Sequence, residues 1–236
     1  MSNSLQKVAY ITGGTKGIGK GIAEALLQNN YRVAISGREL SVVQEIAAQL
    51  GKSDQVIAIK SDVRNYQEEE KAIQTIVEQF GRVDVVIANA GLGIFASIED
   101  LSLEDWNAMI DTNLTGVFHT LKASIKQLKE HKGYFISVAS LAGINFFASG
   151  AGYNASKFGV VGFSQAAMLD LRNADIKVTT ILPGSVTSNF NNHEPSEADA
   201  WKIQPEDIGE LVVDILKMNP RVLPSKIEVR PLKTSK

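Results

Sequence analysis

Short apolar runs rich in β-branched residues alternate with longer amphipathic segments along the whole chain. This pattern is typical of a parallel sheet whose strands are joined by helices, because each parallel connection must cross the sheet. The strands are predicted at residues 8–12, 32–36, 56–60, 83–88, 134–138, 177–181 and 227–229. The helices are predicted at residues 17–28, 40–50, 67–80, 103–129, 152–174 and 205–218, the fourth broken or bent near Asn113.

The length and spacing of these elements favour a single domain over residues 1–236. Each crossover is long enough for a right-handed βαβ unit, and seven strands complete one doubly wound sheet. Ligands of such sheets bind beyond the carboxyl ends of the strands. We therefore expect a cofactor half over about residues 1–130 and a catalytic and substrate half over about residues 131–236.

The charge pattern argues against several classes of partner. The chain has 24 Lys and Arg against 26 Asp and Glu, with no basic or acidic block, so neither nucleic acid nor a membrane surface is expected. The absence of cysteine excludes disulfides and thiolate chemistry and fits a reducing cytoplasm. No stretch reaches the roughly 20 apolar residues of a membrane span, so we predict a soluble, cytoplasmic protein.

A glycine-rich turn, TGGTKGIG, follows the first predicted strand and leads directly into a helix. Such glycines allow a tight turn and let backbone amides approach a pyrophosphate at the helix N-terminus. A strand-to-helix turn without a ligand is the alternative. The candidate cofactor-binding residues of this turn are Gly13, Thr15, Lys16, Gly17, Ile18 and Gly19.

The end of the second strand indicates which dinucleotide is bound. Gly37 stands where an acidic residue would accept hydrogen bonds from the ribose 2′-OH, and Arg38 can bind a 2′-phosphate. With Lys16 as a second cation, these residues favour NADP(H) over NAD(H). Alternatively, Glu39 binds the ribose, or the cations are solvated surface charges. Asp62 is either a hydrogen-bond acceptor for the adenine amino group or an ordinary turn aspartate.

Tyr153 and Lys157 are four residues apart in a predicted helix, so they share one face. A phenol has a pKa of about 10, and a nearby cation lowers it, which suits reversible proton transfer to a carbonyl oxygen. Ser140 lies thirteen residues before Tyr153. Alone, the Tyr–Lys spacing also occurs by chance on solvated helices.

Motifs of one enzyme family occur in the family's order along the chain. The matching residues are the glycine turn at 12–19, Asp62 with Val63, Asn89-Ala90-Gly91, Asn113, Ser140, Tyr153 with Lys157, and Pro183-Gly184 with Thr187. Val186, between them, is a further candidate cofactor-binding residue. The chain thus resembles the short-chain dehydrogenase/reductase family in its compact single-domain branch. One departure is Ala88, which replaces the first Asn of the family's N-N-A-G segment.

The resemblance implies a Rossmann-type α/β fold with a seven-stranded, mainly parallel sheet in the order 3-2-1-4-5-6-7 and helices on both faces. It also implies roles for four catalytic residues. Ser140 would bind the substrate oxygen, Tyr153 would exchange the proton, Lys157 would lower the pKa of Tyr153 and bind the nicotinamide ribose, and Asn113 would hold a water that links Lys157 to solvent. No metal is required.

The resemblance implies an NADP(H)-dependent carbonyl reductase or alcohol dehydrogenase acting on a small molecule. A 3-oxoacyl-carrier-protein reductase is one alternative, and a catalytically silent NADP(H)-sensing protein is another. The substrate wall is expected from residues 92–96, from 141–150 with Phe146 and Phe147, and from 186–201, which suggests a carbonyl compound with some hydrophobic bulk.

The segment 155–171 is apolar on nearly every face, so we expect it to pack against a second copy of the chain. The resemblance implies a homodimer or homotetramer, because the family commonly pairs this helix and its neighbour across a two-fold axis and often forms tetramers through its last strand. The chain ends in a charged, proline-containing tail, IEVRPLKTSK, which departs from the short apolar ends common among tetramers of the family.

Overall fold

The structure is a computed structural model that describes residues 6–188 and 190–234. Asn189 of the expected substrate wall, and Ser235 and Lys236 of the tail, lie outside the described residues. Seven strands form one sheet, and every neighbouring pair is parallel. The strands are β1 Val8–Thr12, β2 Arg32–Gly37, β3 Val56–Lys60, β4 Val85–Ala88, β5 Tyr134–Val138, β6 Lys177–Pro183 and β7 Lys226–Val229. Their order, β3-β2-β1-β4-β5-β6-β7, confirms the predicted order.

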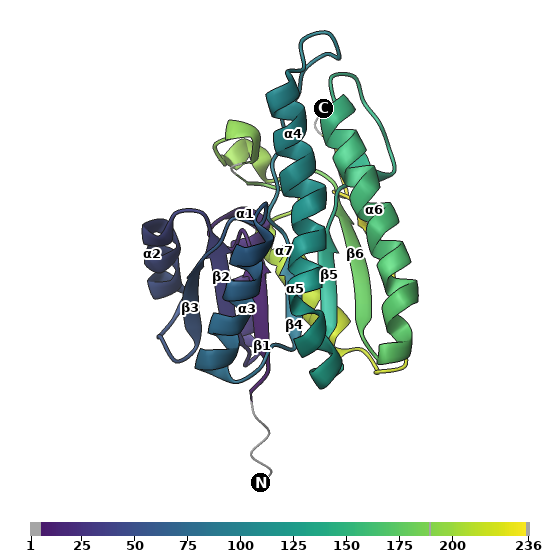
Figure 1. The fold of residues 1–236 in the computed structure, drawn as a ribbon. Helices are drawn as coiled ribbons and strands as arrows, with labels where there is room; N and C mark the ends of the chain where they lie inside the picture. The colour runs from purple at the N-terminus through teal and green to yellow at the C-terminus, as the bar shows by residue number, and fades with distance from the viewer. Residues whose placement is uncertain (1–5, 189, 235–236) are drawn as a thin grey trace.

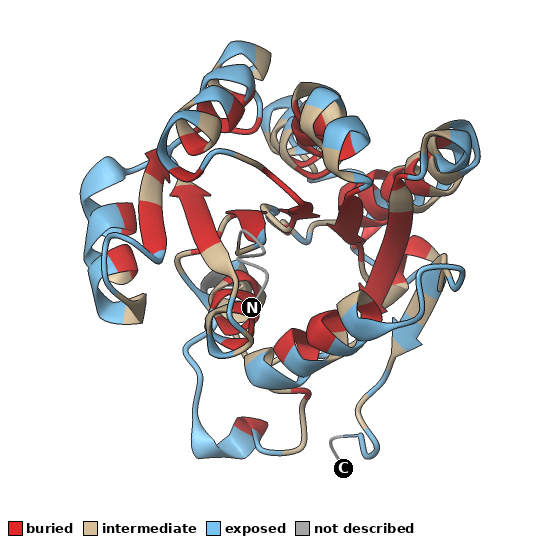
Figure 2. Cartoon of the chain, turned by 90° about the horizontal axis from the view of Figure 1, so that it is seen from below, coloured by how far each residue is buried: buried red, intermediate tan, exposed pale blue. Residues whose placement is uncertain are grey.

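Helices cover both faces of the sheet, as Figure 1 shows. They are α1 Gly17–Gln28, α2 Leu40–Leu50, α3 Tyr66–Phe80, α4 Leu103–Ile110, α5 Gly116–His131, α6 Ala151–Leu171 and α7 Pro205–Lys217. Apolar side chains of α3, α5 and α6 form one core with the sheet, and those of α1, α2 and α7 form the other. The central strands are therefore buried between two helical layers (Figure 2).

Local sequence signals account for many helix ends. The Asn65 side chain caps α3 by accepting from the backbone N–H of Gln67 at 3.0 Å, and Gly81 ends the same helix with a φ of 83°. Pro205 opens α7, where its missing N–H costs no helical hydrogen bond. No helix in residues 6–188 and 190–234 is long and apolar enough to cross a membrane.

The break that the sequence predicts near Asn113 is a π-helical turn, Asp111–Thr115, between α4 and α5. Such a turn inserts a residue into the helical ladder and often marks a functional site. The structure differs from the prediction at the fourth strand, which begins at Val85 rather than at residue 83. Asp84, just before the strand, bonds β1 with both backbone and side chain. Its N–H donates to the carbonyl oxygen of Val8, and its Oδ2 accepts from the N–H of Val8, both at 2.9 Å.

Candidate active site

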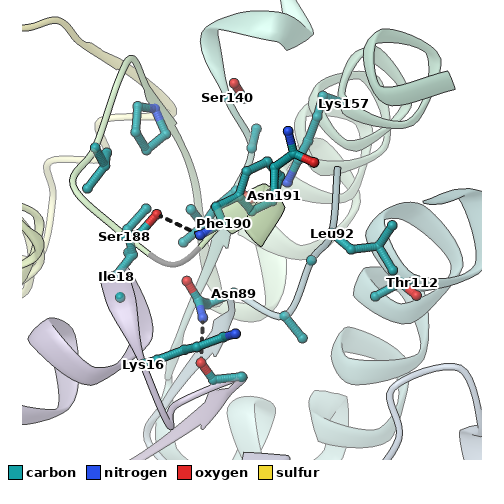
Figure 3. A pocket seen from close by; sticks show the side chains of 18 of the residues that line it. Lys16, Ile18, Asn89, Leu92, Thr112, Ser140, Lys157, Ser188, Phe190 and Asn191 are labelled. Atoms are coloured by element: carbon teal, nitrogen blue, oxygen red, sulfur yellow. Dashed lines mark hydrogen bonds between the residues drawn. The ribbon is translucent and has the colours of Figure 1, made fainter. Parts of the chain in front are cut away.

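A cleft of about 1210 Å³ lies at the carboxyl ends of the strands, where the segments that follow all seven of them meet. Figure 3 shows Lys16 and Asn89 at one end, Ser140 and Lys157 at the other, and Phe190 between the two ends. Segments far apart in the sequence thus share one elongated cavity. Its length suits a dinucleotide with a substrate beyond one end.

The glycine turn packs too closely against its neighbours for side chains at two positions. Gly13 has a φ of 64°, and a Cβ there would lie 2.9 Å from the Cα of Ala90. A Cβ on Gly19 would lie 2.4 Å from the carbonyl oxygen of Gly13. These contacts leave the backbone at the N-terminus of α1 open to the cleft, which is the cradle that a pyrophosphate requires.

Asn89 holds this turn in place from the neighbouring strand. Its Nδ2 donates to the carbonyl oxygens of Thr12 and Gly13, each at 3.0 Å. The Thr12 hydroxyl in turn accepts from the backbone N–H of Asn89 at 3.0 Å and of Ala90 at 3.1 Å. The A-N-A-G segment therefore braces the turn, although Ala88 replaces the family's first Asn.

Cations line the end of the cleft near β2 and β3. Lys16, Arg38 and Arg64 all contribute to the lining. Gly37 lies close to α2, because a Cβ on it would lie 3.0 Å from the Val43 side chain. Arg64 donates from Nε to both Asp62 oxygens at 3.0 Å, and this contact holds the pKa of the Asp62 carboxyl below its usual value. The Asp62 carboxylate is thus engaged by Arg64, which competes with the expected bond to adenine.

Tyr153 and Lys157 lie on α6 at the opposite end, and both side chains are buried. Burial raises the pKa of the Tyr153 phenol, and a hydrogen bond with Ser140 partly offsets the effect. The expected lowering by Lys157 is not found. Its Nζ donates to the carbonyl oxygen of Val138 at 3.1 Å and lies 5.7 Å from the centre of the tyrosine ring, rather than against the hydroxyl.

Burial also lowers the pKa of Lys157 to about 8. A lysine with this pKa exchanges its proton near neutral pH far more readily than a solvated one. The site therefore contains a phenol that keeps its proton and an ammonium group that gives its proton up more easily.

Asn113 sits in the π-helical turn and is fully buried. Its Oδ1 accepts from the N–H of Leu92, and its Nδ2 donates to the Leu92 carbonyl, both at 2.8 Å, and to Ser156 Oγ at 2.9 Å. Both amide protons are thus used by the protein. The side chain can hold the expected water only through a remaining lone pair on Oδ1.

The family model of the short chain dehydrogenases matches residues 7–199. The chain belongs to the short-chain dehydrogenase family. An uncharacterized oxidoreductase of Staphylococcus aureus strain MW2 is 34% identical over 228 residues, which make up 96% of this chain and 97% of that protein. Another uncharacterized oxidoreductase, from Staphylococcus saprophyticus, is 31% identical over 229 residues, again 96% and 97% of the two chains.

Two solved structures resemble this short-chain dehydrogenase over nearly its whole length. An alcohol dehydrogenase from the archaeon Thermococcus sibiricus, complexed with 5-hydroxy-NADP, has a TM-score of 0.91 at 32% identity, covering 98% of this chain and 99% of that one. A 3-ketoacyl-(acyl-carrier-protein) reductase from Brucella melitensis, complexed with NADH, has a TM-score of 0.87 at 24% identity, with coverage of 97% and 99%. The second likeness concerns the fold alone. Oxidoreductases of this family bind a nicotinamide cofactor.

Most predicted site residues of this short-chain dehydrogenase line the cleft, including Val63, Gly91, Pro183, Gly184 and Val186. Gly19, Asn113 and Thr187 instead support it from behind. The Thr187 hydroxyl accepts from Gln204 Nε2 at 3.0 Å and donates to the Asp199 carbonyl at 3.3 Å. This pair of bonds joins the loop after β6 to the segment before α7.

Sequence patterns did not indicate that the C-terminal segment of this short-chain dehydrogenase reaches the site. Arg230, Pro231 and Thr234 line the cleft, and a Cβ on Gly184 would lie 3.0 Å from Pro231 Cδ. The proline in the tail was the available signal. Of the two neighbouring phenylalanines expected in the substrate wall, Phe147 lines the cleft, whereas Phe146 is 86% exposed and lies outside the lining formed by the described residues.

Proposed function

We propose that this short-chain dehydrogenase is an NADP(H)-dependent oxidoreductase that interconverts a carbonyl compound and an alcohol, with Tyr153 as the acid or base. One observation carries the proposal. The buried Tyr153, with Ser140 and Lys157 beside it, shares a single cleft with the braced glycine turn and with Arg38. A proton donor and a dinucleotide cradle are thus placed on one continuous surface.

The catalytic residues act on the substrate oxygen. Ser140 binds that oxygen and orients it toward Tyr153, whose hydroxyl transfers its proton in reduction and takes one up in oxidation. When bound, the nicotinamide cofactor supplies or accepts the hydride. Holding the reacting groups in one geometry lowers the entropic part of the barrier.

The protonation states favour reduction at neutral pH. The raised pKa of Tyr153 keeps the phenol protonated and ready to donate. Lys157, whose pKa lies at about 8, then returns a proton toward the tyrosine. In oxidation the same phenol must first lose its proton, so we expect that direction to speed up as the pH rises.

Arg38 and Lys16 support the preference for NADP(H). Both line the end of the cleft beyond β2, where Gly37 offers no acidic side chain to repel a 2′-phosphate. Guanidinium groups bind phosphate through paired hydrogen bonds. The side chain of Arg38 is exposed and free to turn toward such a group.

The proposed enzyme also associates with itself. Phe118 on α5, and Phe158 and Leu169 on α6, are exposed apolar side chains on the two helices that the sequence pattern predicts to pair. A dimer or tetramer would cover them. Light scattering coupled to size-exclusion chromatography measures the assembly, and a monomer at micromolar concentration would contradict this part of the proposal.

The deciding experiment follows the absorbance of NADPH during incubation with a panel of aldehydes and ketones. We expect turnover with at least one carbonyl compound, and faster turnover with NADPH than with NADH. Tight NADPH binding without any turnover would instead favour the cofactor-sensing alternative. Activity restricted to a 3-oxoacyl group on its carrier protein, and absent with the free ketone, would favour the carrier-protein reductase.

A further inference from the structure

Three phenylalanines form an aromatic cluster with Tyr153, and two of them lie against its ring. The Phe95 ring lies 5.5 Å from it, centre to centre, in an edge-to-face arrangement at 89°. The Phe190 ring lies 5.6 Å from it at 56°, and the Phe147 ring lies 5.6 Å from Phe95 at 72°. They come from the loops after β4, β6 and β5, so three separate segments contribute to one aromatic cluster that contains Tyr153.

Two glycines leave space for these rings. A Cβ on Gly93 would lie 2.5 Å from Phe190 Cζ, and a Cβ on Gly150 would lie 2.6 Å from Phe147 Cε2. Real Cβ atoms do not approach other atoms so closely, so any other residue at either position would displace a ring. The aromatic arrangement therefore depends on the backbone as well as on the phenylalanines themselves.

The loop that carries Phe147 is fixed by the residue next to Tyr153. Asn154 Nδ2 donates to the carbonyl oxygens of Ala142 and Asn145, both at 2.7 Å. The N–H of Ala96 donates to the Ser149 carbonyl at 3.0 Å, which joins this loop to the one that carries Phe95. The backbones of the two loops that carry Phe95 and Phe147 are thus joined to one another before a substrate arrives.

Phe95 and Phe147 keep part of their surfaces free, being 40% and 47% exposed, and both line the cleft. A planar aromatic group beside them gains edge-to-face or offset contacts in addition to burial of its area, whereas a saturated ring of similar size gains the burial alone. Since the ring of Phe95 lies against that of Tyr153, this contact is available only close to the reacting oxygen.

We propose that the substrate class is a carbonyl compound with an aromatic ring one or two bonds from the carbonyl carbon, recognised by Phe95 and Phe147. This inference rests on the proposed oxidoreductase function and deepens it. Phe190, from the segment after β6, packs against the Tyr153 ring on which the reaction depends.

The test compares phenylacetaldehyde with cyclohexylacetaldehyde, whose carbonyl groups have similar intrinsic reactivity and whose rings differ in aromaticity. With NADPH, we expect kcat/KM to favour the aromatic aldehyde by roughly threefold to tenfold. Phe95→Leu should reduce this ratio to about one. Phe146→Leu, the matched control at an exposed phenylalanine outside the cleft, should leave it unchanged. An unchanged ratio in Phe95→Leu, or a wild-type ratio of one or below, overturns the inference.

A binding measurement separates this inference from the proposed function. Phenylacetamide and cyclohexylacetamide carry the same rings but are not reduced, and ligand-detected NMR with NADP⁺-loaded protein measures the binding of each. Preferential binding of the aromatic amide, lost in Phe95→Leu, supports the aromatic site even if no aldehyde turns over. Turnover of both aldehydes with equal binding of both amides overturns the aromatic site and leaves the oxidoreductase function standing. If the protein shows neither turnover nor preferential binding, both the aromatic site and the oxidoreductase function are overturned.

Discussion

Asn113 holds the backbone of Leu92 through two hydrogen bonds, one to its N–H and one to its carbonyl, both at 2.8 Å. Leu92 directly follows the A-N-A-G segment and lines the cleft. The π-helical turn places the Asn113 side chain within hydrogen-bond distance of this loop, so the turn is bonded directly to the wall of the cleft.

We expect Asn113→Ala to lower the free energy of unfolding by about 3 kcal/mol, because it removes three hydrogen bonds and leaves both polar groups of Leu92 without their partner. Urea unfolding measures this change. Asn107→Ala, at an exposed position on α4, is the control and should have little effect. Equal effects of the two variants would mean that the Asn113 bonds contribute nothing net.

Tyr153→Phe should reduce kcat by about 10²- to 10⁴-fold, because it removes the hydroxyl that exchanges the proton and keeps the ring. The affinity for NADPH, measured by titration, should change little, and the aromatic contacts with Phe95 and Phe190 should persist. A variant that retains wild-type turnover would rule out the acid–base role of Tyr153.

Arg38→Ala should weaken NADPH binding by about 10- to 100-fold and leave NADH binding nearly unchanged, because only NADPH has the 2′-phosphate. Isothermal titration with each cofactor measures both affinities. Lys60→Ala, at an exposed cation outside the cleft lining of the described residues, is the control. If Arg64→Ala instead produces the NADPH-specific loss, the phosphate is recognised by Arg64.

The sequence predicts the architecture well because the fold depends on repeated, local patterns. Alternating strands and helices indicate the seven strands, and the structure confirms their order. The break at Asn113 is also confirmed. The fourth strand begins at Val85 rather than at residue 83, because a pattern of apolar residues does not fix the residue at which strand pairing begins. Asp84 already donates its backbone N–H to Val8 of β1.

The site is harder to predict wherever it depends on side-chain direction or on a distant return of the chain. Arg64 turns onto Asp62, and only the three-dimensional arrangement reveals that competition. Phe146 and Phe147 are adjacent, yet one lies outside the cleft lining and one within it. Pro231 reaches Gly184 because β7 pairs with β6. The roles of the predicted catalytic residues stay predictions that the variants test.

Lys157→Met should abolish turnover and yet raise the free energy of unfolding at pH 7 by about 2 kcal/mol. Burial lowers the pKa of Lys157 from 10.5 to about 8, which destabilises the folded wild type by about 3 kcal/mol at pH 7. The variant is free of this cost but loses the hydrogen bond to Val138, which destabilises it by about 1 kcal/mol. Between pH 8 and pH 10.5 the unfolded wild-type chain binds more protons than the folded one, so wild-type stability rises with pH and the gap closes.

Urea unfolding at several pH values from 7 to 10.5 measures the predicted convergence of wild type and Lys157→Met. Lys71→Met, at an exposed position on α3, should show no such gap at any pH. A Lys157→Met protein that is less stable than wild type at pH 7 would mean that the buried ammonium is compensated by contacts stronger than the bond to Val138.

A second buried titratable group lies beneath the end of the cleft near β2 and β3. Glu69 on α3 is 0% exposed, and its Oε1 accepts from the Tyr10 hydroxyl at 2.9 Å and from the Ser61 hydroxyl at 2.6 Å. Among the described residues, its Oε2 has no hydrogen-bond partner. Burial raises the pKa of the Glu69 carboxyl, although the three neighbouring hydroxyls and His119 act in the opposite direction.

Glu69→Gln should therefore stabilise the protein above neutral pH by about 1–2 kcal/mol, since it removes the buried charge and keeps an oxygen for Tyr10 and Ser61. A carboxyl whose pKa is raised on folding contributes stability below its unfolded pKa and loses that contribution as the pH rises through its folded pKa. The gain should thus be large at pH 8 and small near pH 4, as measured by urea unfolding. Glu70→Gln, at an exposed neighbouring position, should show neither the stabilisation nor its pH dependence. A Glu69→Gln protein less stable than wild type at pH 8 would show that the hydroxyls and His119 outweigh burial.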